Sequence, residues 1–182
     1  IRVVSCRDPG KPVVLKSPPH LGRIEALAER FPGARFVHII RHPYSVFPST
    51  QRLWRSLDMV QGLQSPTHKE LDEYVLSCLE QMYAAFQRQR PNLPAGSICD
   101  LLYEDLVADP LGEVLRIYEQ LGLGEIEPAR RDLEQYVESQ RDFKVNRHQL
   151  QEHDRLQVKN RWGEFFEGYG YDLETPVGDE TA

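Results

Sequence analysis

The chain has 182 residues, of which 40% are hydrophobic and 27% charged, and its formal net charge is −6 at pH 7. This length suits one domain, because a chain of this size buries roughly two-thirds of its unfolded surface. The negative charge argues against broad nucleic-acid binding, which needs a basic face, but it does not exclude a local site for a small anion. No apolar run approaches the roughly 20 residues of a membrane span.

The cysteines are few and widely spaced, and no Cys/His spacing typical of a zinc site is present. We therefore expect no metal site, and we expect a reducing, cytoplasmic location. The sequence starts at Ile1 without an initiator methionine. We expect it to be part of a longer protein that continues on the amino-terminal side.

Two compact apolar runs in the first quarter of the chain predict buried parallel strands. The first lies in Lys11–Lys16 and the second in Phe36–Ile40. Between them, an apolar face within Leu21–Arg30 predicts a helix. Pro18 and Pro19 follow the first run, and we expect them to stop both strand and helix there.

The stretch Arg35–Ser49 predicts a strand that ends, a single arginine, and a helix that starts at once. Pro43 suits a first helical position, whereas Pro48 would kink the helix just before Ser49 and reorient its hydroxyl. Ligands bind at the carboxyl ends of strands in open parallel sheets, and an arginine fork at a helix start suits a phosphate. We predict that Arg41 and Ser49 hold an anion. Lys16 is a second possible ligand, or else a solvated loop lysine.

The remaining elements follow in the same alternating order. Thr67 and Glu70 fit a capping box at the start of a helix, and Ser97–Tyr103 predicts a third strand. Asp109 before Pro110 predicts a helix N-cap, and Gly122 and Gly124 fit its C-cap. Further helices are expected after Pro128 and over Leu156–Phe166. Strands that alternate with helices indicate an α/β fold with a parallel sheet.

Several of these segments, in this order, resemble one family. They are Leu15–His20, Phe31–Pro43 with Ser49, and Tyr103–Leu106 with Asp109-Pro110. Together they resemble the sulfotransferases that use 3′-phosphoadenosine 5′-phosphosulfate (PAPS), nearest to the bacterial branch related to tyrosylprotein sulfotransferases. The resemblance implies a P-loop-type three-layer fold over residues 1–173, followed by a polar tail over residues 174–182.

The resemblance also implies roles for individual residues. Arg41 and Ser49 match the pair that grips the 3′-phosphate of the cofactor, and Tyr103 matches a tyrosine beside the nucleotide. Lys16 matches the lysine that contacts the transferring sulfuryl group, and Lys144 matches a late lysine that reaches the nucleotide phosphates. The implied partners are PAPS, its product adenosine 3′,5′-bisphosphate, and an acceptor with a hydroxyl or amine. That acceptor is a small molecule, glycan, lipid or peptide tyrosine, shaped in part by the segment Arg55–Thr67.

Two departures from the family pattern affect the site. The glycine- and serine/threonine-rich phosphate loop that follows the first strand in this family is absent, so we expect that loop and strand to lie upstream of Ile1. Cytosolic members place a base histidine two residues after the lysine, where this chain has Pro18. His20 lies nearby and is a candidate base, although a helix-start or loop histidine is the simpler interpretation.

Two other function classes stay open at this point. A P-loop kinase-like phosphotransferase would need a magnesium-binding carboxylate at a strand end, and Glu104 or Asp105 could supply one. Against it, the pairing of Arg41 with Ser49 serves a 3′-phosphate that ATP lacks. The chain could instead be a non-catalytic nucleotide-binding fragment, because half of the expected cofactor site is missing from it.

Overall fold

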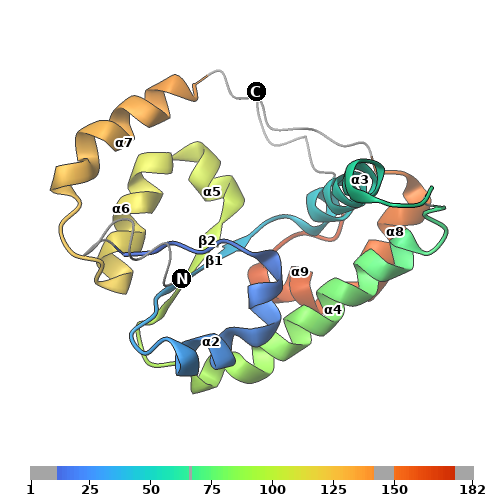
Figure 1. Ribbon diagram of the computed structural model, residues 1–182, viewed down its shortest axis with the longest axis horizontal. Helices are drawn as coiled ribbons and strands as arrows, with labels where there is room; N and C mark the ends of the chain where they lie inside the picture. Colours follow the sequence, from blue (N-terminus) through green and yellow to red (C-terminus); the bar gives the residue numbers. More distant parts are fainter. Residues whose placement is uncertain (1–11, 66, 142–149, 175–182) are drawn as a thin grey trace.

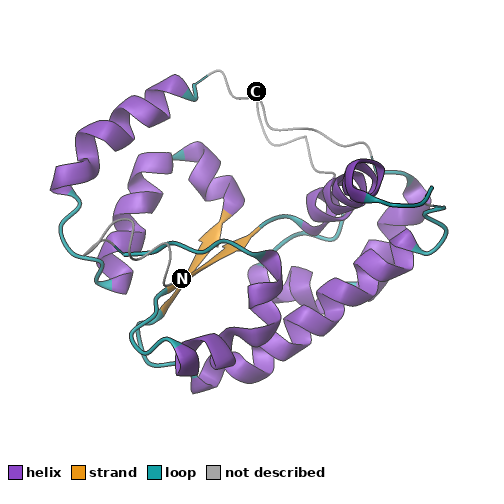
Figure 2. Ribbon diagram, viewed as in Figure 1, coloured by secondary structure: helices purple, strands orange, loops and turns teal. Residues whose placement is uncertain are grey.

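The computed structural model describes residues 12–65, 67–141 and 150–174. In this part of the chain, helices surround a sheet of two parallel strands, β1 (Phe36–Ile40) and β2 (Ile98–Leu102) (Figures 1 and 2). The register places Phe36 opposite Ile98 and Ile40 opposite Leu102. The predicted α/β class with a parallel sheet is therefore confirmed.

Helices supply most of the regular structure. The long helices α3 and α4 form most of the connection between the two strands, and five helices of the described residues, α5 to α9, follow β2. The elements other than strands are η1 (Pro18–Arg23), α2 (Ile24–Arg30), α3 (Pro43–Gln61), α4 (Leu71–Gln89), η2 (Arg90–Asn92), α5 (Tyr103–Ala108), α6 (Pro110–Leu121), α7 (Glu127–Ser139), α8 (Glu152–Arg161) and α9 (Gly163–Tyr169).

Helices lie on both sides of the sheet, which makes three layers (Figure 1). Each side of the sheet has its own hydrophobic cluster. On one face, Cys99 and Leu101 of β2 pack with Ile117 and Leu121 of α6. The larger cluster lies on the other face and joins the sheet to α2, α3, α4, α8 and α9. Its largest fully buried members are Phe47, Phe86, Phe166, Ile40, Leu76 and Val158.

β1 has the predicted bounds, but it is not buried on both faces. Val37 is 43% exposed and Ile39 is 56% exposed. Both are paired with the buried residues Cys99 and Leu101, so they point to the same face of the sheet. Because α6 packs on β2, the described residues leave this face of β1 open. The expectation of a fully buried strand is therefore wrong.

The predicted strand at Lys11–Lys16 is also wrong where the structure describes it. Residues 12–17 form no strand, and Val14 and Leu15 are 91% and 52% exposed. An apolar run becomes a buried strand only where a neighbour supplies hydrogen bonds and a covering layer, and no described segment does so here. The two prolines that follow begin the 3₁₀ helix η1 rather than stopping a helix.

The predicted caps of α6 are confirmed, whereas the predicted cap of α4 is wrong. The Asp109 side chain accepts a hydrogen bond from the Gly112 N–H at 2.9 Å, and Gly122 ends α6 in the left-handed conformation, both as predicted. The capping box at Thr67 is wrong, because α4 starts later, with Glu70 at its N-cap and no side-chain cap. His68 has a φ of 53°, so a turn separates Thr67 from the helix.

The predicted helix over Leu156–Phe166 is divided at Trp162 into α8 and α9. The Trp162 indole N–H donates to the Leu76 carbonyl of α4 at 3.1 Å, and the side chain is 3% exposed. The break places this ring in the large core beside Phe47. It also lets α9 turn back toward the sheet, which brings the end of the described chain close to the strand ends.

A half-buried ionic group joins the sheet to the helical layer. The Asp100 carboxylate of β2 contacts His38 Nδ1 at 3.0 Å and Arg90 Nη2 at 2.6 Å. Burial alone would raise the pKa of Asp100, but the hydrogen bonds from His38 and Arg90 outweigh it and hold the pKa below its usual value. The ionised Asp100 carboxylate therefore links β1, β2 and η2 at the middle pair of the two strands.

Candidate functional site

The carboxyl ends of the two strands bring Arg41 and Tyr103 together. Ile40 is paired with Leu102, so the next residue on each strand emerges at the same edge of the sheet. The Arg41 guanidinium lies over the Tyr103 ring, with its central carbon 4.6 Å from the ring centroid. This cation–π contact orients the guanidinium without using its N–H donors. The two residues matched by family resemblance are thus neighbours in space.

Neither Arg41 nor Ser49 has a polar side-chain partner within the described residues. No described carboxylate forms an ion pair with Arg41, although the side chain is only partly exposed. Ser49 is also half-buried and makes no hydrogen bond with the described residues, whereas the Thr50 hydroxyl donates to the Val46 carbonyl at 2.8 Å. Five guanidinium donors and one hydroxyl are therefore available to an anion.

The helix that carries Ser49 starts as predicted, and its helical backbone continues past Pro48. His42 is the N-cap of α3, its Nδ1 accepts from the Tyr44 N–H at 3.2 Å, and Pro43 is the first helical residue. Pro48 lies inside the helix, which runs on to Gln61. Ser49 is therefore about 9 Å along the helix axis from Pro43, since each residue adds about 1.5 Å.

The junctions after the two strands are linked by a second contact, which the sequence did not predict. The His42 backbone N–H donates to Glu104 Oε1 at 3.0 Å, and the Tyr171 hydroxyl donates to Glu104 Oε2 at 2.8 Å. The Tyr171 and His42 rings also pack together, with centroids 4.8 Å apart. Glu104, considered above as a possible magnesium ligand, thus uses its two oxygens to hold protein donors.

The Tyr171 hydroxyl remains a proton donor well above neutral pH. Burial raises its pKa most, and the hydrogen bond to Glu104 and the charges of Glu104 and Asp105 raise it further. The positive charge of Arg41 opposes this shift. The hydrogen bonds of Glu104 and the contact with the His42 ring place Tyr171 beside the junction that carries Arg41.

The other candidate residues from the sequence analysis have no described contact with the strand-end site. Lys16 is exposed, precedes η1, and forms no hydrogen bond or ion pair with the described residues. His20 lies in η1, where its Nδ1 accepts from Arg23 Nε at 3.3 Å, in agreement with a helix-start histidine. No described contact joins either side chain to Arg41. Lys144 lies outside the described residues.

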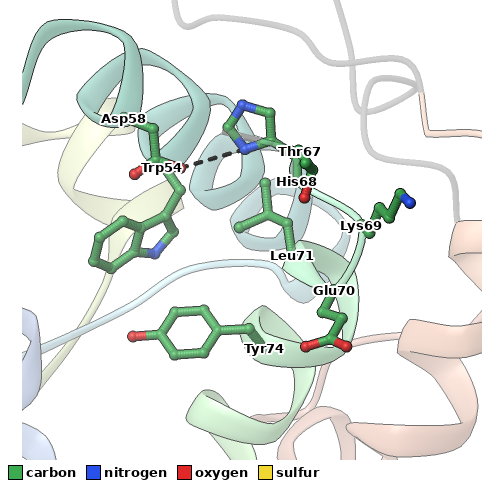
Figure 3. A pocket seen from close by; sticks show the side chains of 8 residues that line it. All are labelled: Trp54, Asp58, Thr67, His68, Lys69, Glu70, Leu71 and Tyr74. Atoms are coloured by element: carbon green, nitrogen blue, oxygen red, sulfur yellow. Dashed lines mark ion pairs between the residues drawn. The ribbon is translucent and has the colours of Figure 1, made fainter. Parts of the chain in front are cut away.

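A cavity of about 510 Å³ lies between the carboxyl-terminal part of α3 and the start of α4 (Figure 3). Trp54 and Tyr74 line it with an edge-to-face contact, their ring centroids 5.6 Å apart. His68 Nδ1 lies 3.3 Å from Asp58 Oδ2 on its rim. The cavity overlaps the end of the Arg55–Thr67 segment, in which we predicted determinants of the acceptor.

The described residues include neither a membrane-spanning helix nor a cluster of metal-ligating side chains. None of their helices is long and apolar enough to cross a lipid bilayer. They also contain no cluster of three or more His, Cys, Asp or Glu side chains arranged to hold a metal ion.

Glu104 and Tyr171 are the two residues of this site that sequence reasoning did not assign to it. Glu104 belongs to the Tyr103–Leu106 motif, and its position directly after a predicted strand could have identified it as a residue of the site. Tyr171 follows Gly170, which ends α9 in the left-handed conformation with a φ of 71°. Its pairing with Glu104 depends on the return of the chain through α8 and α9, and no local pattern indicates that return.

Comparison with known proteins points to one family. A model described as the sulfotransferase family matches residues 2–128. The omega-hydroxy-beta-dihydromenaquinone-9 sulfotransferases of Mycobacterium bovis and Mycobacterium tuberculosis are each 42% identical to the chain over 166 residues. These alignments cover 91% of this chain but 43% of each relative, so the chain spans less than half the length of these relatives.

Solved structures agree at the level of the fold. Sulfotransferase STF9 from Mycobacterium avium superposes with a TM-score of 0.71 at 21% identity, over 89% of this chain and 43% of that one. The sulfotransferase domain from the curacin biosynthetic pathway superposes with a TM-score of 0.55 at 15% identity, over 94% of this chain and 67% of that one. At these identities the likeness concerns the fold alone.

Proposed function

Because the chain belongs to the sulfotransferase family, we propose that it forms part of an enzyme that moves a sulfuryl group from PAPS to an acceptor hydroxyl or amine. The observation that carries this proposal is the strand-end site. Arg41 lies on Tyr103 with its N–H donors unused by the described carboxylates, and the Ser49 hydroxyl on the following helix has no described partner. An arginine fork and a hydroxyl are suitable donors for a phosphate.

In this proposal the described residues bind and orient the nucleotide. Arg41 and Ser49 hold the 3′-phosphate, and Tyr103 lies beside the nucleotide while it supports the guanidinium from below. Lys144 is a further ligand of the phosphates, and Lys16 contacts the sulfuryl group. The remaining ligands, including the expected phosphate loop, belong to sequence outside this chain. The predicted domain over residues 1–173 and the cytoplasmic location are part of the same proposal.

With a hydroxyl acceptor, the reaction exchanges one sulfur–oxygen bond for another. The bond between sulfur and the bridging oxygen of the phosphosulfate breaks, a bond from sulfur to the acceptor oxygen forms, and the acceptor proton passes to a base. Such transfers depend on alignment and on stabilisation of developing charge. A lysine beside the bridging oxygen would offset the charge that develops there, which is the role proposed for Lys16. The base is not assigned to a described residue.

We further propose that the acceptor is a hydroxyl on a mostly apolar molecule. The mycobacterial relatives are named for a hydroxylated menaquinone derivative and are 42% identical to this chain where they align. Leu53 and Val60 lie on α3 at helical spacing from Ser49, and both are exposed, at 53% and 81%. An apolar chain laid along this face would contact them while its hydroxyl pointed toward the nucleotide site.

An activity assay of the natural full-length protein tests both parts. PAPS with a long-chain primary alcohol should yield adenosine 3′,5′-bisphosphate and the alkyl sulfate in equal amounts, detected by mass spectrometry. The alkane of the same length, which lacks the hydroxyl, is the matched control and should give no product. If the alcohol is phosphorylated with ATP as donor and no alkyl sulfate forms with PAPS, the proposal is overturned in favour of a phosphotransferase. Sulfation of polar acceptors alone would overturn the acceptor class.

A further inference from the structure

We propose that Glu104 and Tyr171 position Arg41, so that the segment after α9 forms part of the 3′-phosphate site. This inference rests on the proposed function, because it concerns how the site is held for that phosphate. Neither residue is a proposed ligand of the nucleotide. Their effect on binding would pass through the backbone at the junction between β1 and α3.

Arg41 lies where the chain changes from strand to helix, and that junction needs external support. Arg41 and His42 belong to neither element, and Pro43 has no backbone N–H to offer. The His42 N–H is instead satisfied by Glu104 Oε1 at 3.0 Å. The residue before His42 is Arg41 and the residue before Glu104 is Tyr103. The hydrogen bond from the His42 N–H to Glu104 and the cation–π contact of Arg41 with Tyr103 therefore join the same two strand junctions at consecutive residues.

Tyr171 fixes the carboxylate that makes this bond. Its hydroxyl donates a hydrogen bond to Glu104 Oε2 at 2.8 Å, so each carboxylate oxygen accepts from a different segment of the chain. The Tyr171 ring also packs on the His42 ring, and this side-chain contact restrains the same junction. An exposed glutamate with one hydrogen bond could turn away in solution, whereas one held at both oxygens keeps its orientation.

The segment that carries Tyr171 is itself held on both sides. The Tyr171 N–H donates to the Phe166 carbonyl at 2.9 Å, and the Tyr44 hydroxyl donates to the Leu173 carbonyl at 2.8 Å. Tyr44 belongs to the first turn of α3, so this segment contacts the helix start as well as the junction before it. Three stretches far apart in the sequence thus meet at one anion site.

The charge of Glu104 is compatible with a positioning role. A carboxylate beside a phosphate site would repel the ligand if it pointed at it. Here both oxygens are directed at protein donors, and the Tyr171 pKa is raised, so its proton stays in place at neutral pH. The structure therefore uses Glu104 as an acceptor for the protein rather than as a group that faces the nucleotide.

Nucleotide titrations of the natural full-length protein test the inference. Dissociation constants for adenosine 3′,5′-bisphosphate and adenosine 5′-phosphate are measured by calorimetry for the wild type, Tyr171→Phe, Glu104→Gln and Glu104→Ala. We expect Tyr171→Phe to weaken bisphosphate binding about 3- to 10-fold, less than the full value of a hydrogen bond to a charged group, because the lost bond acts on the phosphate only through the strand junction. Glu104→Ala should weaken it more, and Glu104→Gln, which keeps an acceptor oxygen for His42, should restore much of the loss. Binding of adenosine 5′-phosphate should change little.

Tyr83→Phe is the matched control. It removes a phenolic hydroxyl that accepts from Gln87 Nε2 at 2.6 Å within α4, away from the strand ends, and should leave both dissociation constants unchanged. Equal weakening of both nucleotides in Tyr171→Phe would show a general structural role and overturn the inference, as would wild-type affinities in every variant. If the wild type itself does not prefer the bisphosphate, the proposed function fails and this inference fails with it.

Discussion

Replacing Arg41 with alanine should weaken binding of adenosine 3′,5′-bisphosphate by about 2–5 kcal/mol, the cost of removing one partner of a hydrogen-bonded charge pair. The structure gives the reason for the size of this effect. The guanidinium is supported by the Tyr103 ring and has no described carboxylate to neutralise it, so its charge remains available to the ligand. The change should be smaller for adenosine 5′-phosphate, which lacks the 3′-phosphate.

The fold should tolerate this substitution. Arg41 makes no hydrogen bond or ion pair with the described residues, and its main packing partner is a half-exposed ring. Thermal unfolding of Arg41→Ala should therefore match that of the wild type. Arg30→Ala is the matched control, because Arg30 is an exposed arginine at the end of α2, and it should bind both nucleotides normally.

Calorimetric titration of the natural full-length protein, with and without the substitution, measures this prediction. Arg41→Lys should recover part of the affinity, because the charge is kept and the planar fork is lost. An Arg41→Ala protein that loses the same free energy with both nucleotides would remove the 3′-phosphate from this site. So would a protein with unchanged affinity for the bisphosphate.

Replacing Lys16 with alanine should lower kcat about 100- to 1000-fold, in the range seen when one donor to a developing charge is removed. Nucleotide affinity should be largely kept, because Arg41 and Ser49 are proposed to hold the phosphate. Lys16 is exposed and has no described partner, so its removal leaves no buried group unpaired. Any loss of turnover would then reflect the chemical step rather than unfolding.

Steady-state kinetics with PAPS, together with a bisphosphate titration, separates these two quantities. His20→Ala is the informative neighbour, since His20 is bound to Arg23 in η1, and its removal should change kcat little. A Lys16→Ala enzyme with full kcat would show that this lysine is not catalytic. A large loss in His20→Ala, with Lys16→Ala unaffected, would transfer the catalytic role to the histidine.

Local patterns predicted the elements whose determinants lie within a few residues. β1 has its predicted bounds because a β-branched run is followed by Arg41 and a proline that suits a helix start. The Asp109 cap and the Gly122 C-cap were equally local. The run at Lys11–Lys16 failed because its state depends on a neighbouring strand that the described chain does not supply. The capping box failed because the left-handed His68 delays the helix.

Local patterns likewise predicted some residues of the site and not others. Arg41, Ser49 and Tyr103 could be named from their motifs, and the pairing of Ile40 with Leu102 explains why two of them meet. The link from Glu104 to Tyr171 could not be named, because it depends on the break at Trp162 and on the path of α9 back to the sheet. Sequence reasoning thus found the proposed ligands but not the residues that hold them in place.

The most direct test of the 3′-phosphate assignment is a crystal structure of the natural full-length protein with adenosine 3′,5′-bisphosphate. We predict that the 3′-phosphate lies within hydrogen-bond distance of the Arg41 guanidinium and the Ser49 hydroxyl, with the Glu104–Tyr171 bond intact behind them. A bisphosphate whose 3′-phosphate lies away from Arg41, or whose 5′-phosphate occupies this position instead, would contradict the account.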